Sequence, residues 1–290
     1  MKAKATFAAA ASLLAAALFN PSTAAFASAD GHGGKTITIA TEGAFRPYNF
    51  TNPDGSLAGY EIDYYKILCA RMKVECKLVV IPFNSLIPSL LSGKVDVLMS
   101  GLSATPKRRE TIAFSAPYSA VGSRFVTLKS SPLAKLPGEG SVLWLDKDAA
   151  GLQRFIAAIK PQLAGKVIGV QTASVASAFI DKYLKGVATV REYKTPEEAD
   201  LDLLSGRIDI TLVSMSYMQG ASRKPANARL TMAGPQLSGG VFGAGASLGL
   251  RKGDTALLER FDQAIKATIA EGVTRQLSLQ WIGFDTTPAP

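Results

Sequence analysis

Short apolar runs alternate with longer amphipathic stretches along most of the 290-residue chain. Runs rich in β-branched residues predict strands, and stretches in which apolar residues recur at helical spacing predict helices. The predicted helices cover residues 61–72, 86–91, 175–184, 196–204 and 255–270. Because helices separate successive strands, the pattern favours an α/β fold with mainly parallel strands.

Two distant segments repeat each other and indicate two similar lobes. Residues 92–103 read S-G-K-V-D-V-L-M-S-G-L-S, and residues 205–216 read S-G-R-I-D-I-T-L-V-S-M-S. In both, a Leu-Leu pair comes before, a glycine ends the predicted helix and a β-branched strand follows. A weaker likeness pairs residues 35–41 with residues 166–172. The alternative is a chance likeness of two common helix-to-strand junctions.

The strand ends predict where a ligand binds. In open α/β sheets, ligands lie beyond the carboxyl ends of the strands. Those ends fall at residues 41–45 and 100–103 in the first half, and at 171–174 and 214–216 in the second. Two sheets that present these ends to each other form a cleft suited to a small molecule.

The sequence T-P-K-R-R-E from Thr105 predicts a short helix with an unusual charge pattern. Thr105 suits the N-cap, and the proline after it suits the first helical position. Three cations in a first turn oppose the helix dipole and therefore need solvent or an anion. We expect Lys107 and Arg109 to lie in solvent and Arg108 to bind a carboxylate by bidentate hydrogen bonds. Solvent exposure of all three is the alternative.

The first 29 residues have the organisation of a secretory signal peptide. Two lysines precede an apolar run over residues 7–19, and small residues follow. The run is too short to span a bilayer, and cleavage after Ala27 or, preferably, Ala29 fits the small-residue rule. A buried apolar helix is the alternative. We expect export to the periplasm, with the mature protein starting near residue 30.

Few residues are available for nucleophilic or metal chemistry. The chain has one histidine, His32, and two cysteines, Cys69 and Cys76, which flank a helix-to-strand turn. In an oxidising compartment we expect the cysteines to form a disulfide, with two free buried thiols as the alternative. We expect no metal and no cofactor, because this inventory does not easily supply a zinc site or a histidine-based triad.

The charge balance does not indicate a nucleic-acid partner. The 32 Lys and Arg residues against 23 Asp and Glu give a net charge of +9. However, no dense basic cluster is interleaved with aromatic residues, so we expect no binding of nucleic acid.

Six motifs, in order, carry a resemblance to a known family. They are E-G-A-F-R-P-Y-N from Glu42, G-Y-E-I-D from Gly59, L-I-P-S-L from Leu86, S-G-K-V-D from Ser92, S-A-T-P-K-R from Ser103 and F-S-A-P-Y from Phe114. Through them, residues 35–285 resemble the polar amino-acid-binding proteins of bacterial ABC importers, a group with lysine/arginine/ornithine-, histidine- and opine-binding members. The cysteine-flanked loop resembles that subgroup's disulfide. Residues 136–165, longer than in the smaller members, resemble the opine-binding branch.

The resemblance implies a two-lobed periplasmic binding protein of type II, each lobe a mixed sheet flanked by helices. It places lobe 1 at residues 30–120 plus 243–290 and lobe 2 at residues 121–242. Two crossing hinge strands near residues 119–123 and 239–245 would join the lobes, the second rich in glycine and suited to backbone rearrangement.

The resemblance also implies roles for residues of lobe 1. Arg108 matches the arginine that binds the ligand's α-carboxylate, and Ser103 matches a hydroxyl beside it. Phe45 and Phe83 match aromatic walls around the ligand side chain, for which ordinary core packing is the alternative. Glu42 matches a carboxylate that meets a distal cation, or it is a solvated loop acid. The remaining matches are contacts at the strand end, made by Ser100 and Gly101.

In lobe 2 the chain departs from the family pattern. Ala173 and Ser174 match a loop whose amides contact the carboxylate. At position 214, however, a serine stands where the family usually has an aspartate that pairs with the α-ammonium group. Because a hydroxyl cannot neutralise a buried cation, Ser214 favours a ligand with a substituted, differently placed or absent amine, such as an opine.

The expected function is therefore that of a monomeric, non-catalytic solute-binding protein that delivers a carboxylate-bearing nitrogen compound to a membrane permease. One alternative is a secreted dehydratase-like enzyme on the same scaffold, with Glu42 as its acid or base. Another is a ligand-sensing module that serves a receptor.

Overall fold

The structure, a computed structural model, describes Met1 and residues 36–288. Apart from Met1, the signal peptide predicted over residues 1–29 lies outside the described residues. Residues His32–Pro290 make up one structural unit, and both lobes lie within it.

Lobe 1 is built on a five-stranded sheet with the order β5-β1-β6-β14-β7. Its strands are β1 (Ile37–Thr41), β5 (Cys76–Val80), β6 (Val97–Leu98), β7 (Ala113–Ser119) and β14 (Ala246–Leu250). A small sheet beside it comprises β2 (Ala44–Phe45), β3 (Asn49–Thr51) and β4 (Leu57–Ala58). The helices are α1 (Tyr60–Met72), α2 (Leu86–Leu91), α3 (Pro106–Arg109), α8 (Thr255–Ala270) and α9 (Val273–Trp281), with a 3₁₀ turn over Phe83–Ser85.

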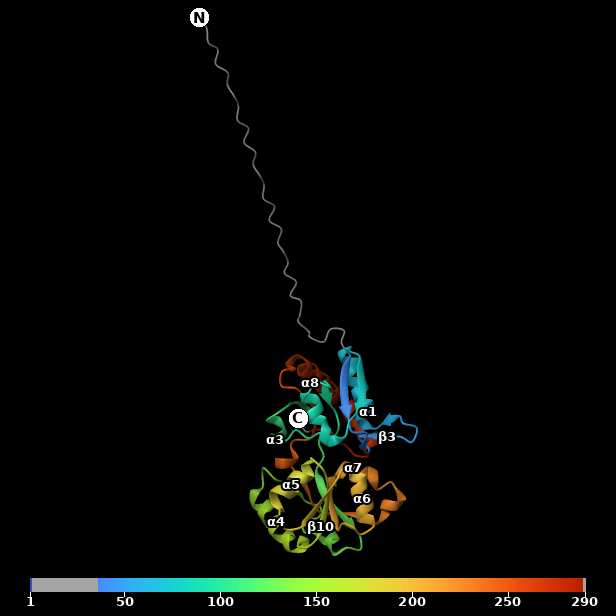
Figure 1. The fold of residues 1–290 in the computed structure, drawn as a ribbon, viewed down its shortest axis with the longest axis vertical. Helices are drawn as coiled ribbons and strands as arrows, with labels where there is room; N and C mark the ends of the chain where they lie inside the picture. Colours follow the sequence, from blue (N-terminus) through green and yellow to red (C-terminus); the bar gives the residue numbers. More distant parts are fainter. Residues whose placement is uncertain (2–35, 289–290) are drawn as a thin grey trace. The chain divides into compact units, whose positions relative to one another are not determined.

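Lobe 2 is built on a six-stranded sheet with the order β11-β10-β12-β8-β13-β9. Its strands are β8 (Ser123–Leu128), β9 (Val142–Trp144), β10 (Val167–Gln171), β11 (Thr189–Tyr193), β12 (Ile210–Ser214) and β13 (Leu230–Ser238). The helices are α4 (Ala149–Leu163), α5 (Val175–Tyr183), α6 (Pro196–Leu204) and α7 (Met215–Ala221), and 3₁₀ turns cover Pro132–Lys135, Pro225–Arg229 and Gly240–Phe242. Helices α4 and α5 flank this sheet on one side, and α6 and α7 on the other (Figure 1).

The chain crosses between the two sheets twice. It leaves lobe 1 after β7, enters lobe 2 at β8, and returns between β13 and β14 over residues 239–245. The predicted two-lobed α/β fold is therefore confirmed. Strand β8 pairs antiparallel with β12 and β13, and β14 pairs antiparallel with β6 and β7, whereas β13 pairs parallel with β9. The expectation of mainly parallel strands therefore holds for β1, β5 and β6 and for β10, β11 and β12, and not for the pairs of β8 and β14 or for the antiparallel sheet of β2, β3 and β4.

The sequence repeat corresponds to one unit used in both lobes. Strand β1 lies between β5 and β6, and β10 lies between β11 and β12, all in parallel pairs. The repeated aspartate has the same task in each: Asp96 accepts the backbone N–H of Thr38 at 3.0 Å, and Asp209 that of Val167 at 2.8 Å. The repeated glycines, Gly93 and Gly206, have φ of 75° and 73°, where a side chain would be strained.

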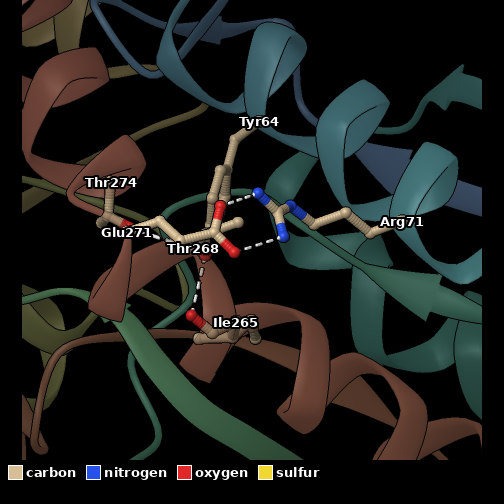
Figure 2. Close-up of polar contacts among 6 residues, drawn as sticks. All are labelled: Tyr64, Arg71, Ile265, Thr268, Glu271 and Thr274. Carbon is tan, nitrogen blue, oxygen red and sulfur yellow. Dashed lines mark hydrogen bonds and ion pairs between the residues drawn. The ribbon is translucent and has the colours of Figure 1, made fainter.

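Helix α1 connects the sheet of lobe 1 to the C-terminal helices. The hydroxyl of Tyr64 lies 2.7 Å from the hydroxyl of Thr268 in α8, and both residues are buried. At the protein surface, both nitrogen atoms at the tip of Arg71 reach the carboxylate of Glu271 (Figure 2). Each lobe has its own apolar core on its sheet.

The five predicted helices agree with α1, α2, α5, α6 and α8 to within a residue at each end. Cys69, in α1, and Cys76, in β5, form the predicted disulfide, so the alternative of free thiols is wrong. Among residues 36–288, no helix combines the length and the hydropathy that a bilayer crossing requires.

Candidate ligand-binding site

A pocket lies between the two lobes, where the segments after β1 and β6 face those after β10 and β12. This is the place that the strand ends predict. The space not filled by atoms is about 870 Å³, and this figure includes open solvent. Of the predicted site residues, those that line it are Glu42, Phe45, Phe83, Ser100, Gly101, Ser103, Arg108, Ser174 and Ser214. Glu42 and Arg108 are the only charged residues among the described residues that line it.

Arg108 bridges the lobes. Thr105 caps α3 by accepting the backbone N–H of Arg108 at 3.2 Å, which confirms the predicted start of this helix. The guanidinium donates from Nη1 to the carbonyl of Ser103 and from Nη2 to the carbonyl of Ala173 in lobe 2, both at 3.0 Å. It also lies over the ring of Phe83, 5.6 Å from its centroid. No carboxylate pairs with it within the described residues, and desolvation lowers its pKa to about 10.

The neighbouring cations differ from Arg108, as predicted. Lys107 is exposed and pairs with Glu110 at 2.6 Å. Arg109 is also exposed and lies over the ring of Phe114, 5.4 Å from its centroid. Neither lines the pocket.

Glu42 is the acid of the pocket, and only 7% of it is exposed. Its carboxylate accepts a hydrogen bond at 2.7 Å from the amide of Gln171 in lobe 2. Burial raises the pKa of Glu42 to about 8, and the charge of Glu61 adds to the rise, whereas the Gln171 bond opposes it. The solvated loop acid that was the alternative is therefore wrong.

Aromatic rings from both lobes stack together beside the pocket. Phe45, in β2, stacks with Tyr48 at a centroid distance of 5.4 Å and with Tyr217, in α7 of lobe 2, at 5.8 Å. The hydroxyl of Tyr217 donates to the buried carboxylate of Asp200 at 2.6 Å. Desolvation raises the pKa of Asp200 to about 6. Phe45 thus both lines the pocket and packs against lobe 2.

A buried carboxylate holds the strand-end loop of lobe 1. Glu61 accepts the backbone N–H of Gly101 at 2.7 Å, the side-chain amide of Asn49 at 2.6 Å and the hydroxyl of Tyr118. Gly101 has φ of 56°, and a Cβ there would lie 2.8 Å from the ring of Phe45. A glycine is therefore required at position 101. The backbone N–H of Glu42 bonds to the hydroxyl of Ser100 at 3.0 Å.

The lobe 2 residues match their expected places with one difference. Ser174 caps α5 with its hydroxyl and lines the pocket. Ala173 does not line it, and it contributes its carbonyl to Arg108 from a backbone with φ of 60°. Ser214 ends β12, and its hydroxyl lies 2.7 Å from that of Ser216. No carboxylate stands at this end of the described pocket.

Sequence reasoning missed several lobe 2 residues that contact lobe 1 or support such a contact. Tyr217 and Asp200 lie in helices of lobe 2, and no spacing signal connects them to Phe45. Gln171 lies in the strand-end segment that was predicted, but its partner could not be read from the sequence. Tyr48 was part of the motif from Glu42, which is a signal that could have indicated it.

The fold and the pocket agree with comparisons to known proteins. Residues 37–284 match the family of bacterial extracellular solute-binding proteins, family 3. The chain belongs to this family.

Curated relatives cover nearly the whole chain. The octopine-binding periplasmic protein of Rhizobium meliloti is 40% identical over 272 residues, which are 88% of this chain and 92% of that protein. The L-arginine-binding protein of Pseudomonas aeruginosa is 33% identical over 255 residues, covering 87% and 89%. The histidine-binding periplasmic protein of Salmonella typhimurium is 31% identical over 271 residues, covering 92% and 94%.

Solved structures share the two-lobed fold. An ancestral arginine-binding protein bound to arginine superposes with a TM-score of 0.72 at 26% identity, covering 86% of this chain and 98% of that one. A His/Glu/Gln/Arg/opine family-binding protein from Silicibacter pomeroyi in complex with lysine gives a TM-score of 0.68 at 26% identity, covering 88% and 100%.

Proposed function

We propose that the protein is exported to the periplasm, binds a small carboxylate-bearing nitrogen compound there as a monomer, and delivers it unchanged to the membrane permease of an ABC importer. Its family and its relatives, which are periplasmic binding proteins, support this proposal. The observation that carries it is the guanidinium of Arg108 in the interlobe pocket, which faces no carboxylate of the described chain. A guanidinium in that setting suits a ligand carboxylate.

The neutral end of the pocket at Ser214 favours an opine, in which the α-nitrogen of a basic amino acid carries a carboxyalkyl group. The pocket's one acid, Glu42, suits the guanidinium at the far end of such a ligand. A free α-ammonium group would then find no counter-charge among the described residues that line the pocket. An opine supplies its own second carboxylate beside the nitrogen, so the protein need not supply an aspartate. The 40% identity to an octopine-binding protein agrees with this choice.

Closure of the lobes would complete the binding site. The crossings after β7 and between β13 and β14 would act as hinges, with lobe 1 over residues 30–120 plus 243–290 and lobe 2 over residues 121–242. A ligand that contacts both lobes binds the closed arrangement more tightly and so shifts the population toward it. The lobe contacts made by Arg108 and Glu42 mark the surfaces that meet.

Calorimetric affinities for octopine and free arginine test the ligand class. We expect the wild type to bind octopine about 100-fold more tightly than arginine, because an unpaired buried charge costs several kcal/mol. Ser214→Asp should lower the ratio of the octopine affinity to the arginine affinity by at least about tenfold, because the aspartate gives the α-ammonium group of arginine a partner. Ser130→Asp makes the same charge change at an exposed site of lobe 2 and should leave the ratio unchanged. Equal affinities in the wild type, unaltered by Ser214→Asp, would contradict the proposed class.

The absence of chemical conversion is tested on the same samples. After prolonged incubation with the protein, mass spectrometry should recover octopine unchanged. A product that forms only in the presence of the protein would support the dehydratase-like alternative, for which Glu42 is the available acid or base.

A further inference from the structure

A second pocket lies between the lobes and shares no residue with the ligand pocket. Lobe 1 contributes the turn between β2 and β3 and the end of α9, and lobe 2 contributes the end of α7 and the residues after it. The lining residues are Arg46, Pro47, Phe50, Gly220, Arg223, Lys224 and Trp281. Three of them are cations, and none is an acid.

Two of these cations have no anionic partner. Among residues 36–288, the side chains of Arg46 and Arg223 donate no hydrogen bond and form no ion pair. The guanidinium carbon of Arg46 lies over the ring of Phe50, 3.4 Å from its centroid, and Trp281 meets that ring edge-on at 6.1 Å. Stacking on a ring leaves the N–H groups at the rim of a guanidinium free to donate.

Glu197, an acid near Arg46, does not serve as its ion-pair partner. Glu197, whose charge acts on Arg46, is held by Lys224 at 2.5 Å. That ion pair balances one cation of the pocket against one acid outside it. Among residues 36–288, the guanidinium groups of Arg46 and Arg223 therefore remain without an ion pair, although the charge of Glu197 acts on Arg46.

We propose that this pocket binds a single oxyanion, a carboxylate or a phosphate, between Arg46 of lobe 1 and Arg223 of lobe 2. The lobes touch beside it, since a Cβ on Gly220 would lie only 2.9 Å from the Cδ of Pro47. An anion that contacts both arginines binds this arrangement of the lobes better than a separated one. The anion therefore favours the closed arrangement of the lobes. By linkage, the anion raises the protein's affinity for the cleft ligand by the same factor by which the cleft ligand raises the protein's affinity for the anion.

Thermal unfolding of the ligand-free mature protein tests the site, with inorganic phosphate titrated at constant ionic strength. We expect a saturable rise in Tm of about 2–4 °C for the wild type. Arg46→Gln and Arg223→Gln should each abolish it, and the exposed position of Arg223 makes its variant safe to fold. The matched control Arg154→Gln, an exposed arginine of α4, should keep the rise.

Three outcomes overturn the proposal. A rise that does not saturate and that all variants share is a general salt effect. A rise that Arg108→Gln abolishes, but Arg46→Gln does not, places phosphate in the ligand pocket instead. No rise in any of the proteins with either phosphate or acetate also contradicts it. Because no cleft ligand is present, these results are independent of whether the proposed ligand class is right.

The coupling is measured separately, by octopine titrations with and without saturating phosphate. We expect the octopine affinity to rise about fivefold in the wild type and to stay unchanged in Arg223→Gln. An equal rise in the octopine affinity of both proteins would contradict the proposed coupling between the anion and closure of the lobes.

Discussion

Burial acts in opposite directions on the two charges of the ligand pocket. It lowers the pKa of Arg108 only to about 10, so the guanidinium stays charged at neutral pH. It raises the pKa of Glu42 to about 8, so this carboxyl group is mostly protonated at neutral pH in the ligand-free pocket. The proposed anchor for a ligand carboxylate, Arg108, is thus charged at neutral pH, whereas Glu42, the proposed site for a ligand cation, must lose a proton first.

The affinity for a cationic ligand should therefore depend on pH. A cation beside Glu42 favours the carboxylate, so binding releases a proton when the pH is below about 8. The affinity for octopine should rise with pH from about 6 to 8, by at most tenfold per unit, and then level off. Calorimetry in buffers of different ionisation enthalpy measures the released proton.

Glu42→Gln is the control for that titration. This variant should remove the pH dependence of the octopine affinity that comes from Glu42 and keep any pH dependence that comes from Asp200. Proton uptake on binding, or the same pH profile in wild type and Glu42→Gln, would contradict the assignment.

Single residues could be predicted where the residue type was unusual for its position in the sequence. Arg108 stood out because three cations at a helix start need an explanation, and Ser214 because it departs from a family pattern. The role of Glu61 was not predictable, although its motif was noticed, since it depends on three partners that are remote along the chain. Tyr217 and Gln171 were missed for the same reason.

At the scale of elements, helix α7 packs against lobe 1. Gly220 is buried in this helix against Pro47 of lobe 1, where the proline ring cannot turn aside. The stack of Tyr217 on Phe45 comes from the same helix. Helix α7 thus lies against lobe 1 at both Tyr217 and Gly220.

Gly220→Ala should weaken the binding of octopine without lowering the free energy of unfolding. Alanine favours a helix over glycine by up to about 1 kcal/mol, so the free energy of unfolding should not fall. The added methyl group keeps the lobes apart, so the affinity for octopine should fall about five- to tenfold. Urea denaturation and calorimetry measure the two quantities.

Gly253→Ala is the matched control, because a Cβ there has nothing within 4 Å. An unchanged affinity in Gly220→Ala would show that the lobes close without this contact.

The disulfide should matter for stability and not for binding. Cys69 and Cys76 are 7 residues apart and do not line the pocket. Replacing both with serine should lower the free energy of unfolding by about 2–3 kcal/mol, because the closed loop is short. Denaturant unfolding measures the loss, and the affinity for octopine should stay within about twofold. An unchanged denaturation midpoint would contradict this role.

Elements with a regular pattern were predictable, and those decided by packing were not. The five predicted helices show apolar spacing and clear ends. Helix α7 has too few turns to show a period, and α4 contains Pro161, which argues against a helix when the sequence is taken alone. The antiparallel pairing of β8 and β14 involves strands on either side of the crossings between the lobes, which no local pattern contains.

For the whole molecule, the described arrangement joins the lobes through side chains of the ligand pocket. Arg108 bonds to Ala173, and Glu42 bonds to Gln171. These bonds use the same groups that a carboxylate and a cation would need. Ligand binding is therefore an exchange of bonds between lobes for bonds through the ligand, and its specificity depends on how well the ligand replaces them.

The most direct test of this account is the affinity for octopine in the wild type, Arg108→Gln and Arg109→Gln. Arg109, beside Arg108 on α3, is exposed and does not line the pocket, so its variant controls for charge and helix effects. Loss of a buried charge-assisted pair leaves the ligand carboxylate unpaired and typically costs 2–5 kcal/mol. We predict at least about 100-fold weaker binding for Arg108→Gln and less than about a twofold change for Arg109→Gln. Binding by Arg108→Gln within about threefold of the wild type would contradict the account.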